Sequence, residues 1–420
     1  MKRTSIIALL SASLFICFPL VEMILNGCDI AGAISYRIWL MFLYIPGAIG
    51  ILLISRYIKT RHLYKLPIIL MIVFGIWCII CTTQSQTLPL SLFGFVPMSD
   101  SVSVYLSYFG MIMLGLILGG DKKYALLAAK IFMAMTILVS ILSIIDSPKL
   151  DCLFVNEATN CFHYQGVYFN TNQFGYHLSI ALIINAYLIE YTSKKLERII
   201  YIICFAILIN MLILNNTMGS YLAVFLALIF AVIWSFINRE DKKLPLLALG
   251  LFIAFSAISC IYCNNVINNF VSMFGDVGTL IEDDSSLDQI NSIGSSRGKL
   301  WLLALKMIKV SPIIGFGLQG IGFSAHNMFL QIAMYVGIPG LLLYLSIIVS
   351  GAVRLVKIRK DISPITRACA FAVVSYLISG FFGVTVFYTA PYFYLVLGVC
   401  LAGCAIEKPR DGDASRFYFI

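Results

Sequence analysis

Two residues in the last third of the chain have side chains suited to chemistry on a phosphorylated substrate. Arg297 begins an apolar helical segment, where the helix dipole favours an anion and a guanidinium group can bind phosphate in a fork geometry. His326 precedes another apolar segment, and an imidazole of ordinary pKa, about 6.5, can accept a proton from an attacking hydroxyl. Either residue alone is also compatible with an interfacial anchor. The pair, separated by a glycine-rich turn, predicts a catalytic site.

The turn between them reads Gly315-Phe-Gly317-Leu-Gln-Gly320 and matches the dinucleotide-binding fingerprint letter for letter. That fingerprint requires a preceding strand within a βαβ unit, whereas a proline-containing break comes first here. We therefore interpret the match as coincidental. Two interpretations of Gly315 and Gly317 remain open: a flexible turn, or a backbone that approaches an anionic ligand closely.

Cysteine and acidic clusters offer weaker candidates. The pairs Cys78-x-x-Cys81 and Cys260-x-x-Cys263 lie at the ends of apolar segments without a histidine or acidic partner, which favours packing over zinc binding. Cys152 and Cys161 share one predicted outer loop, and the sequence leaves open whether they form a disulfide. The acidic run at 282–284 is typical of a solvated loop, with a divalent metal as the alternative. We expect neither a metal nor a cofactor.

The elements that must position these groups are membrane helices. Of the 420 residues, 60% are hydrophobic and only 12% are charged, and the mean hydropathy is +0.95. No soluble domain of this size could bury so much apolar surface, so the composition indicates a bilayer as the solvent. The net charge of +9 comes from short basic clusters between apolar stretches, which excludes a nucleic-acid partner.

About twelve segments are long enough to cross a hydrocarbon core of roughly 30 Å as helices. They lie near 4–25, 35–55, 66–83, 102–120, 124–145, 173–192, 199–215, 219–237, 244–263, 328–350, 368–387 and 389–406. The sequence thus predicts an all-α polytopic membrane protein. Residues 1–263 hold nine spans with outer loops near 84–101 and 146–172, residues 264–327 form a large outer loop, residues 328–406 hold three spans, and residues 407–420 form a tail.

Basic residues set the orientation. If the chain starts inside, 22 of its 29 lysines and arginines fall at the N-terminus, in inner connections or in the tail, which is a strong positive-inside signal. Both termini are therefore expected in the cytoplasm, and the large loop outside. A cleaved signal peptide is the alternative for the first span, but its apolar run is too long. The span centres carry almost no ionisable residue, which argues against an ion-coupled transporter.

Two features concern cations on the outer side. In the large loop, Ser295 and Ser296 are expected to cap a helix that starts near Arg297 and stops before Pro312. Lys299 lies on its basic face, opposite an apolar face, which describes a helix lying flat on the outer leaflet. Arg37 stands at the outer end of the second span, and it either snorkels to the surface or serves as a second phosphate ligand.

Several of these motifs, taken in order, resemble those of the O-antigen ligase and polymerase superfamily. The resemblance covers Ser296-Arg297 through Trp301, Pro312-Ile-Ile-Gly315-Phe-Gly317, His326-Asn327-Met-Phe-Leu330, and Gly337-Ile-Pro-Gly340. The stretch Phe169-Asn170-Thr-Asn172 also looks like the Asn-x-Asn motif that enters a central span in that family. The strong match spans about 50 residues, and the layout of twelve spans with a large late outer loop agrees with it.

The resemblance implies an inverting membrane glycosyltransferase of GT-C type in the bacterial inner membrane, acting at the periplasmic face. Its donor would be a glycan on undecaprenyl diphosphate, so membrane lipids are partners, and a chain-length regulator is a further candidate. By analogy, Arg297 would hold the diphosphate and His326 would assist the acceptor hydroxyl. Arg37, Asn170, Asn172, Lys299, Gly315, Gly317 and Asn327 would complete the substrate site. Preorganised cations stabilise a leaving diphosphate most in the transition state.

One departure from the family bears on the function. Members commonly carry a Ser-Arg or Thr-Arg pair at the start of the eighth span, whereas this chain reads Asn216-Thr-Met-Gly-Ser220. The absence favours a repeat-unit polymerase over an O-antigen ligase, which would transfer the glycan to lipid A–core. A lipid-linked oligosaccharide flippase is the alternative of another class, and the long outer loop argues against it.

Overall fold

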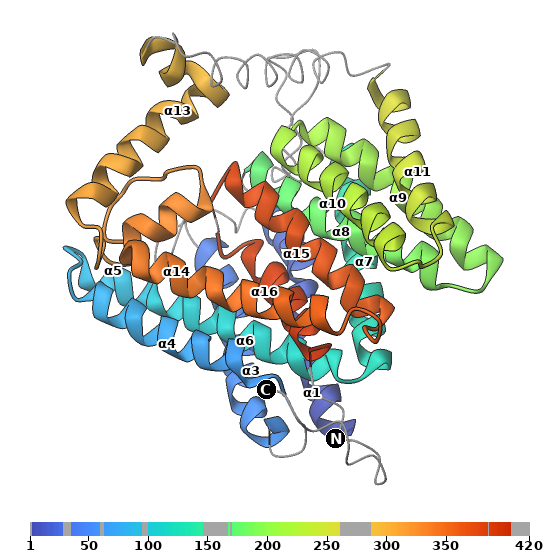
Figure 1. Cartoon of the computed structure of the whole chain (residues 1–420), viewed down its shortest axis with the longest axis horizontal. Coiled ribbons are helices and arrows are strands. Elements are labelled where there is room, and N and C mark those ends of the chain that lie inside the picture. The colour runs from blue at the N-terminus through green and yellow to red at the C-terminus, as the bar shows by residue number, and fades with distance from the viewer. Residues whose placement is uncertain are drawn as a thin grey trace.

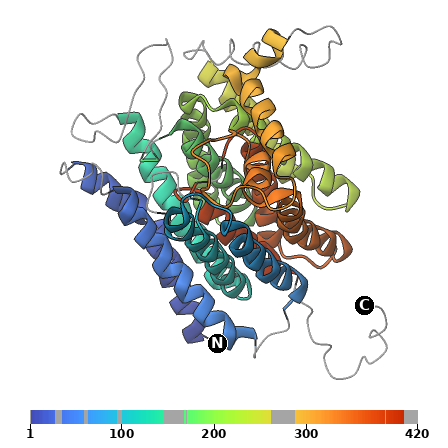
Figure 2. The same cartoon turned by 90° about the vertical axis from the view of Figure 1, so that its left-hand side faces the viewer.

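The computed structural model describes residues 2–27, 35–58, 63–94, 100–145, 167–168, 170–260, 287–384 and 386–404. The described part of the chain is helical and contains no strand. Its elements are α1 (Lys2–Ile16), α2 (Phe18–Gly27), α3 (Ser35–Ile58), α4 (Lys65–Thr82), α5 (Leu88–Phe93), α6 (Val102–Gly119), α7 (Lys122–Ile145), α8 (Thr171–Tyr191), α9 (Lys195–Asn215), α10 (Met218–Ile237), α11 (Lys243–Cys260), α13 (Leu287–Val310), α14 (Met328–Lys357), α15 (Pro364–Phe381) and α16 (Ala390–Ala402). Figures 1 and 2 show a helical bundle with α13 at one end.

The all-α polytopic membrane fold predicted from the sequence is confirmed. Among the described residues, nine helices are long and apolar enough to cross a membrane, and α11 and α16 are shorter apolar helices. Each of the twelve predicted segments overlaps a helix, and the first segment contains both α1 and α2. The exact number of spans stays a prediction.

Helix α8 is the most polar of the central helices. It buries Gln173, His177 and Asn185 and is not among the nine apolar spans. The surrounding helices satisfy part of this polarity: Thr136 on α7 lies 2.8 Å from His177 Nε2, and Gln173 Nε2 donates to the Val384 carbonyl at 3.0 Å. A helix of this kind is stable at membrane depth because protein rather than lipid surrounds it.

The centre of the bundle is formed by α6 and α16 packed backbone to backbone. A Cβ atom on Gly115 would lie 2.1 Å from the Leu395 carbonyl oxygen, and one on Gly398 would lie 2.2 Å from that of Ile112. Small residues permit such close helix contacts, and these supply the van der Waals energy that replaces hydrophobic driving force inside a bilayer.

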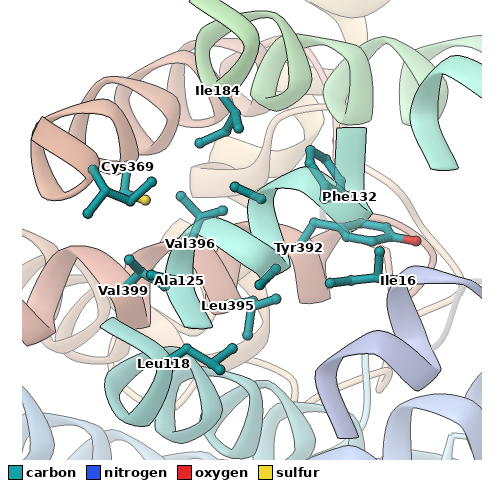
Figure 3. Close-up of a pocket in the computed structure, with 13 residues that line it drawn as sticks. Ile16, Leu118, Ala125, Phe132, Ile184, Cys369, Tyr392, Leu395, Val396 and Val399 are labelled. Atoms are coloured by element: carbon teal, nitrogen blue, oxygen red, sulfur yellow. The ribbon is translucent and has the colours of Figure 1, made fainter. Parts of the chain in front are cut away.

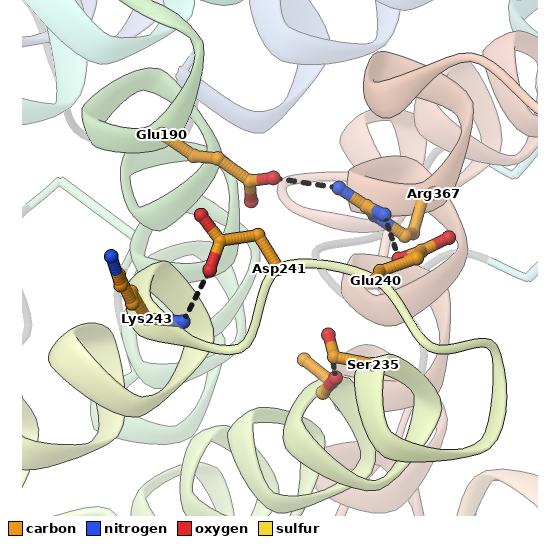
Figure 4. A network of polar contacts seen from close by, with 7 residues as sticks. Glu190, Ser235, Glu240, Asp241, Lys243 and Arg367 are labelled. Atoms are coloured by element: carbon orange, nitrogen blue, oxygen red, sulfur yellow. Dashed lines mark hydrogen bonds and ion pairs between the residues drawn. The ribbon is translucent and has the colours of Figure 1, made fainter.

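The two ends of the bundle differ in character. Helices α6, α8, α10 and α14 begin at one end, the site end, and α13 lies there (Figure 1). At the opposite end Arg367 of α15 donates to Glu190 at the end of α8, at 2.7 Å, and to Glu240 after α10 (Figure 4). One guanidinium therefore ties three elements together, which fixes the ends of α8, α10 and α15 relative to one another.

Three features differ from the sequence-based expectation. Helix α13 begins at Leu287, so Ser295 and Ser296 lie inside it, and their predicted role as caps is wrong. A short helix, α5, interrupts the first outer segment, and its Gly94 C-cap adopts the left-handed conformation. Helix α14 extends to Lys357, beyond the predicted end near residue 350, and it contains a break at Gly337.

Several expectations lie outside the described residues. These are the pairing of Cys152 with Cys161, the acidic run at 282–284, Cys263, and the tail at 407–420. Cys78 and Cys81 are described: both are buried and free, and Cys81 Sγ donates to the Val336 carbonyl at 3.7 Å. That contact agrees with the packing interpretation of this pair.

Candidate active site

Arg297 and His326 lie within electrostatic range of each other at the site end of the bundle. Arg297 is in α13 and is half-buried, and Trp301 of the same helix packs edge-on against Phe381 at the end of α15, with ring centroids 5.5 Å apart. This contact anchors α13 over the bundle. The Arg297 charge acts on His326 and also on Tyr176 of α8, so the three side chains are electrostatic neighbours. The tertiary structure thus brings the two predicted catalytic residues together.

The loop that carries His326 is held in an uncommon conformation. His326 has φ +48°, in the left-handed region that non-glycine residues rarely adopt. Asn327 begins α14 and its Oδ1 accepts from the amides of Phe329 and Leu330 at 3.0 and 3.1 Å. These caps fix the backbone immediately after His326.

Gln331, one turn into α14, fixes the backbone immediately before His326. Its Oε1 accepts from the Ala325 amide at 2.7 Å, and its Nε2 donates to the Phe323 carbonyl at 3.2 Å. The Gln331 residue is 4% exposed. The buried Gln331 side-chain amide thus uses both its donor and its acceptor on the loop. These two hydrogen bonds help to hold His326 in its strained backbone conformation.

The electrostatics of His326 suit a proton acceptor. Burial, and then the nearby Arg297 charge, lower the pKa of its imidazole below the ordinary value of 6.5. Both effects disfavour the imidazolium form. The side chain is therefore neutral at neutral pH and able to take a proton from a hydroxyl.

The glycine-rich turn braces a break in α14. Pro339 has no N–H, so the Tyr335 carbonyl loses its helical partner, and the Gly317 amide donates to it instead at 2.9 Å. The Phe316 amide likewise donates to the Met334 carbonyl at 3.0 Å. Trp77 Nε1 on α4 donates to the Val336 carbonyl at 2.8 Å. The turn and α4 together satisfy the carbonyls that the break sets free.

The two glycines of this turn are required by its geometry. Gly315 and Gly317 have φ +69° and +83°, and a Cβ atom on Gly315 would lie 2.6 Å from the backbone of Met334 and Tyr335. The Gly315 amide donates to the Ser311 carbonyl at 3.2 Å. Both glycine amides are therefore engaged within the fold, and substrate binding by these residues stays a prediction without a free N–H to support it.

Three buried hydroxyl groups in the first turns of α8 and α10 are unpaired in the described part of the chain. The Tyr176 hydroxyl, Thr217 Oγ1 and Ser220 Oγ are buried, and none has a hydrogen-bond partner within the described residues. A Cβ atom on Gly175 would lie 2.8 Å from Ser220 Oγ and from Thr217 Cβ, so the start of α10 directly contacts the start of α8. Buried hydroxyls without partners are costly, which makes them candidate donors to a ligand.

The structure places the remaining predicted residues as follows. Arg37 is exposed at the start of α3, and its guanidinium lies beside the Tyr36 ring, 5.7 Å from the centroid. Asn170 begins α8, and its Oδ1 accepts from the Asn172 amide at 2.8 Å. Lys299 is exposed on α13. No contact of Arg37 or Lys299 with Arg297 or His326 occurs in the described part of the chain, so their binding roles stay predictions.

A small cavity deep in the bundle is lined mainly by apolar side chains, unlike the candidate active site. It measures about 40 Å³ and lies between α1, α6, α7, α8, α15 and α16 (Figure 3). Its walls are side chains such as Leu118, Phe132 and Leu395, and Tyr392 is the lining residue that carries a hydroxyl. A space this small and apolar is a packing gap that suits neither a sugar nor a phosphate.

Sequence reasoning missed Tyr176 and Gln331. Tyr176 lies one turn after Asn172, at the motif that enters α8, and its type carries no distinctive sequence signal. Gln331 lies four residues after Asn327, a spacing that puts a polar group on the same face of the first turn as the cap. That spacing was the available signal.

Comparison with known proteins finds one family whose sequence model matches part of the chain. Residues 203–345 match the sequence model of a family described as O-antigen ligase. The matched region contains Ser220, Arg297, the glycine-rich turn, His326 and the break in α14. The search of curated proteins found no match. The chain is therefore a multi-pass membrane protein, and part of it, residues 203–345, is similar to the O-antigen ligase family.

Proposed function

We propose that this protein is a repeat-unit polymerase of O-antigen or capsular polysaccharide. It would transfer a glycan from undecaprenyl diphosphate to the non-reducing end of another lipid-linked repeat unit. The observation that carries the proposal is the electrostatic coupling of Arg297 and His326 within a region that matches a family described as O-antigen ligase. The positive-inside distribution of basic residues supports a site at the periplasmic face of the inner membrane, with both termini in the cytoplasm.

The proposed step is an inverting displacement at the anomeric carbon of the donor. The acceptor hydroxyl oxygen forms the new glycosidic bond while the bond from that carbon to the diphosphate oxygen breaks. The hydroxyl proton passes to the neutral imidazole of His326 and then to water. Negative charge develops on the leaving diphosphate, and Arg297 stabilises it in the transition state.

Hydroxyl groups would supply what a second arginine supplies elsewhere in the superfamily. The start of α10 has no arginine, but Thr217 and Ser220 there and Tyr176 on α8 present buried, unpaired hydroxyls. Neutral donors bind phosphate oxygens without adding charge, so the site keeps one cation near the diphosphate. Arg37 remains the alternative second cation.

The matched family is described as O-antigen ligase, which makes ligase the second candidate. A ligase would use the same donor chemistry and pass the glycan to lipid A–core. A deletion strain separates the two functions. Loss of a polymerase leaves core capped by a single repeat, whereas loss of a ligase leaves bare core with chains stranded on the carrier.

Single substitutions test the site itself. Arg297→Ala and His326→Ala should each reduce transfer by about a hundredfold or more, the size typical of a lost charge-stabilising donor or general base. Lys306→Ala is the matched control, because Lys306 is an exposed cation on the same helix. Normal polysaccharide chains in cells carrying either alanine variant as their sole copy would refute the assignment.

A further inference from the structure

Asp100 is a buried carboxyl group that the proposed reaction does not use. It stands directly before α6 at the site end and is 5% exposed, and its Oδ1 has no hydrogen-bond partner within the described residues. Burial raises the pKa of this carboxyl to about 8. A buried, incompletely paired acid costs folding free energy, and the described residues supply no partner for Asp100 Oδ1, which makes this atom a candidate to bind a ligand.

The Asp100 backbone is attached to the loop that carries His326. Gln319, which lies within the glycine-rich turn, has φ +54°, and its Oε1 accepts from the Asp100 amide at 2.8 Å. Tyr335 on α14 is within electrostatic reach of Asp100 and also contacts Gln331, which holds the other end of the same loop. The loop from Gln319 to His326 therefore connects Asp100 to the Arg297 site.

The surroundings of Asp100 exclude two kinds of ligand. Its electrostatic neighbours among the described residues are the phenols Tyr105, Tyr108, Tyr335, Tyr344 and Tyr376, and no cation is among them. A phosphate would find no counter-charge there. A polyprenyl chain would leave the Asp100 oxygen unpaired. The Tyr108 hydroxyl also lacks a partner, so the region has spare hydrogen-bonding capacity in addition to aromatic faces.

A neutral polyhydroxylated ligand needs no counter-charge and leaves no acid oxygen unpaired, because its hydroxyls pair with the acid and its ring packs on aromatic side chains. We propose that Asp100 and Gln319 form an acceptor subsite in which the Asp100 carboxyl hydrogen-bonds a hydroxyl of the acceptor sugar. This inference rests on the proposed function. It assigns the two substrates to different groups: Arg297 takes the donor diphosphate, Asp100 takes the acceptor sugar, and the loop that ends at His326 joins them.

The test is the effect of Asp100 substitutions on acceptor and donor KM separately. The purified protein in lipid nanodiscs is assayed with two separate substrates. The lipid-linked repeat unit is the donor, and the lipid-free repeat-unit oligosaccharide is the acceptor analogue. Asp100→Leu should raise the acceptor KM about tenfold, the effect of one lost hydrogen bond to a substrate hydroxyl, with the donor KM unchanged. Asp100→Asn should raise it less, because an amide still pairs with a hydroxyl. Asp121→Asn is the control, a half-buried carboxylate whose Oδ1 accepts from the Lys123 amide at 3.1 Å.

Two results would overturn the inference. One is an unchanged acceptor KM in Asp100→Leu. The other is an equal rise in both KM values together with a lower unfolding temperature, which would indicate a structural role. If the wild-type protein transfers no glycan at all, the proposed function fails instead. Calorimetric binding of the lipid-free repeat-unit oligosaccharide to the wild-type and Asp100→Leu proteins then still tests the subsite by itself.

Discussion

Substituting Gly315 by alanine tests whether the contacts between the glycine-rich turn and α14 stabilise the fold. At φ +69°, an alanine costs about 1–2 kcal/mol relative to glycine because of its left-handed backbone. The new methyl group would also lie 2.6 Å from the Met334 and Tyr335 backbone, where real Cβ atoms are not found. The turn must then move away from α14.

The size of the effect follows from the contacts that such a movement breaks. The Phe316 amide donates to the Met334 carbonyl at 3.0 Å, and the Gly317 amide donates to the Tyr335 carbonyl at 2.9 Å. Each hydrogen bond contributes about 1 kcal/mol, and the Tyr335 carbonyl has no helical alternative because Pro339 follows it. Together with the backbone cost, Gly315→Ala should lower the free energy of unfolding by about 3 kcal/mol, roughly a hundredfold in the equilibrium.

The assay is thermal unfolding of the purified protein in one detergent, followed by far-UV circular dichroism. Gly322→Ala is the control, since a Cβ atom there meets nothing within 4 Å. Gly322→Ala should unfold at the wild-type temperature and Gly315→Ala several degrees lower. If the two variants unfold alike, the turn does not brace α14. An unchanged unfolding temperature with a raised donor KM would instead support the alternative in which Gly315 binds the substrate.

Three further predictions concern the active site and the opposite end of the bundle. The acid limb of the pH–rate profile should lie below pH 6.5, because burial and Arg297 lower the His326 pKa and activity is lost only when the imidazole is protonated. In single-turnover assays, Arg297→Gln should move this limb to higher pH, whereas Arg297→Lys, which keeps the charge, should not. Gln331→Met should reduce kcat about tenfold because it frees the loop that carries His326, and Gln331→Glu should reduce it less because it keeps the acceptor for the Ala325 amide. Equal kcat values in both variants and in the wild type would contradict a positioning role for Gln331. Arg367→Met should lower the free energy of unfolding by about 1–2 kcal/mol, because Glu190 and Glu240 lose their shared cation and the pairs are only partly exposed. Lys194→Met removes an exposed ion pair and should have almost no effect in the same unfolding assay.

The sequence by itself determined the class of fold. Hydrocarbon thickness fixes the length of a spanning helix, and lipid leaves a spanning backbone no partner outside its own helix. Apolar runs therefore predict helices directly, and each predicted segment overlaps one. The identity of Arg297 and His326 as chemical candidates also came from sequence, because their residue types stand out against an apolar background.

Local patterns were less reliable where two interactions compete. Ser295 and Ser296 have the type of cap residues, but α13 begins before them, at Leu287, so neither stands at a helix start. Gly315 and Gly317 were recognised as a special turn, whereas their role in bracing α14 depends on a break at Gly337, about twenty residues later.

The tertiary structure alone decided which polar groups meet. Arg297, Tyr176 and His326 come from three elements separated by well over a hundred residues at the extremes, and no spacing rule relates them. The same holds for Asp100 with Gln319, and for Arg367 with Glu190 and Glu240. Burial and unpaired hydrogen-bonding capacity are properties of packed surroundings. A sequence shows that a carboxyl or hydroxyl exists, and only the packing of the helices shows that it has been left without a partner.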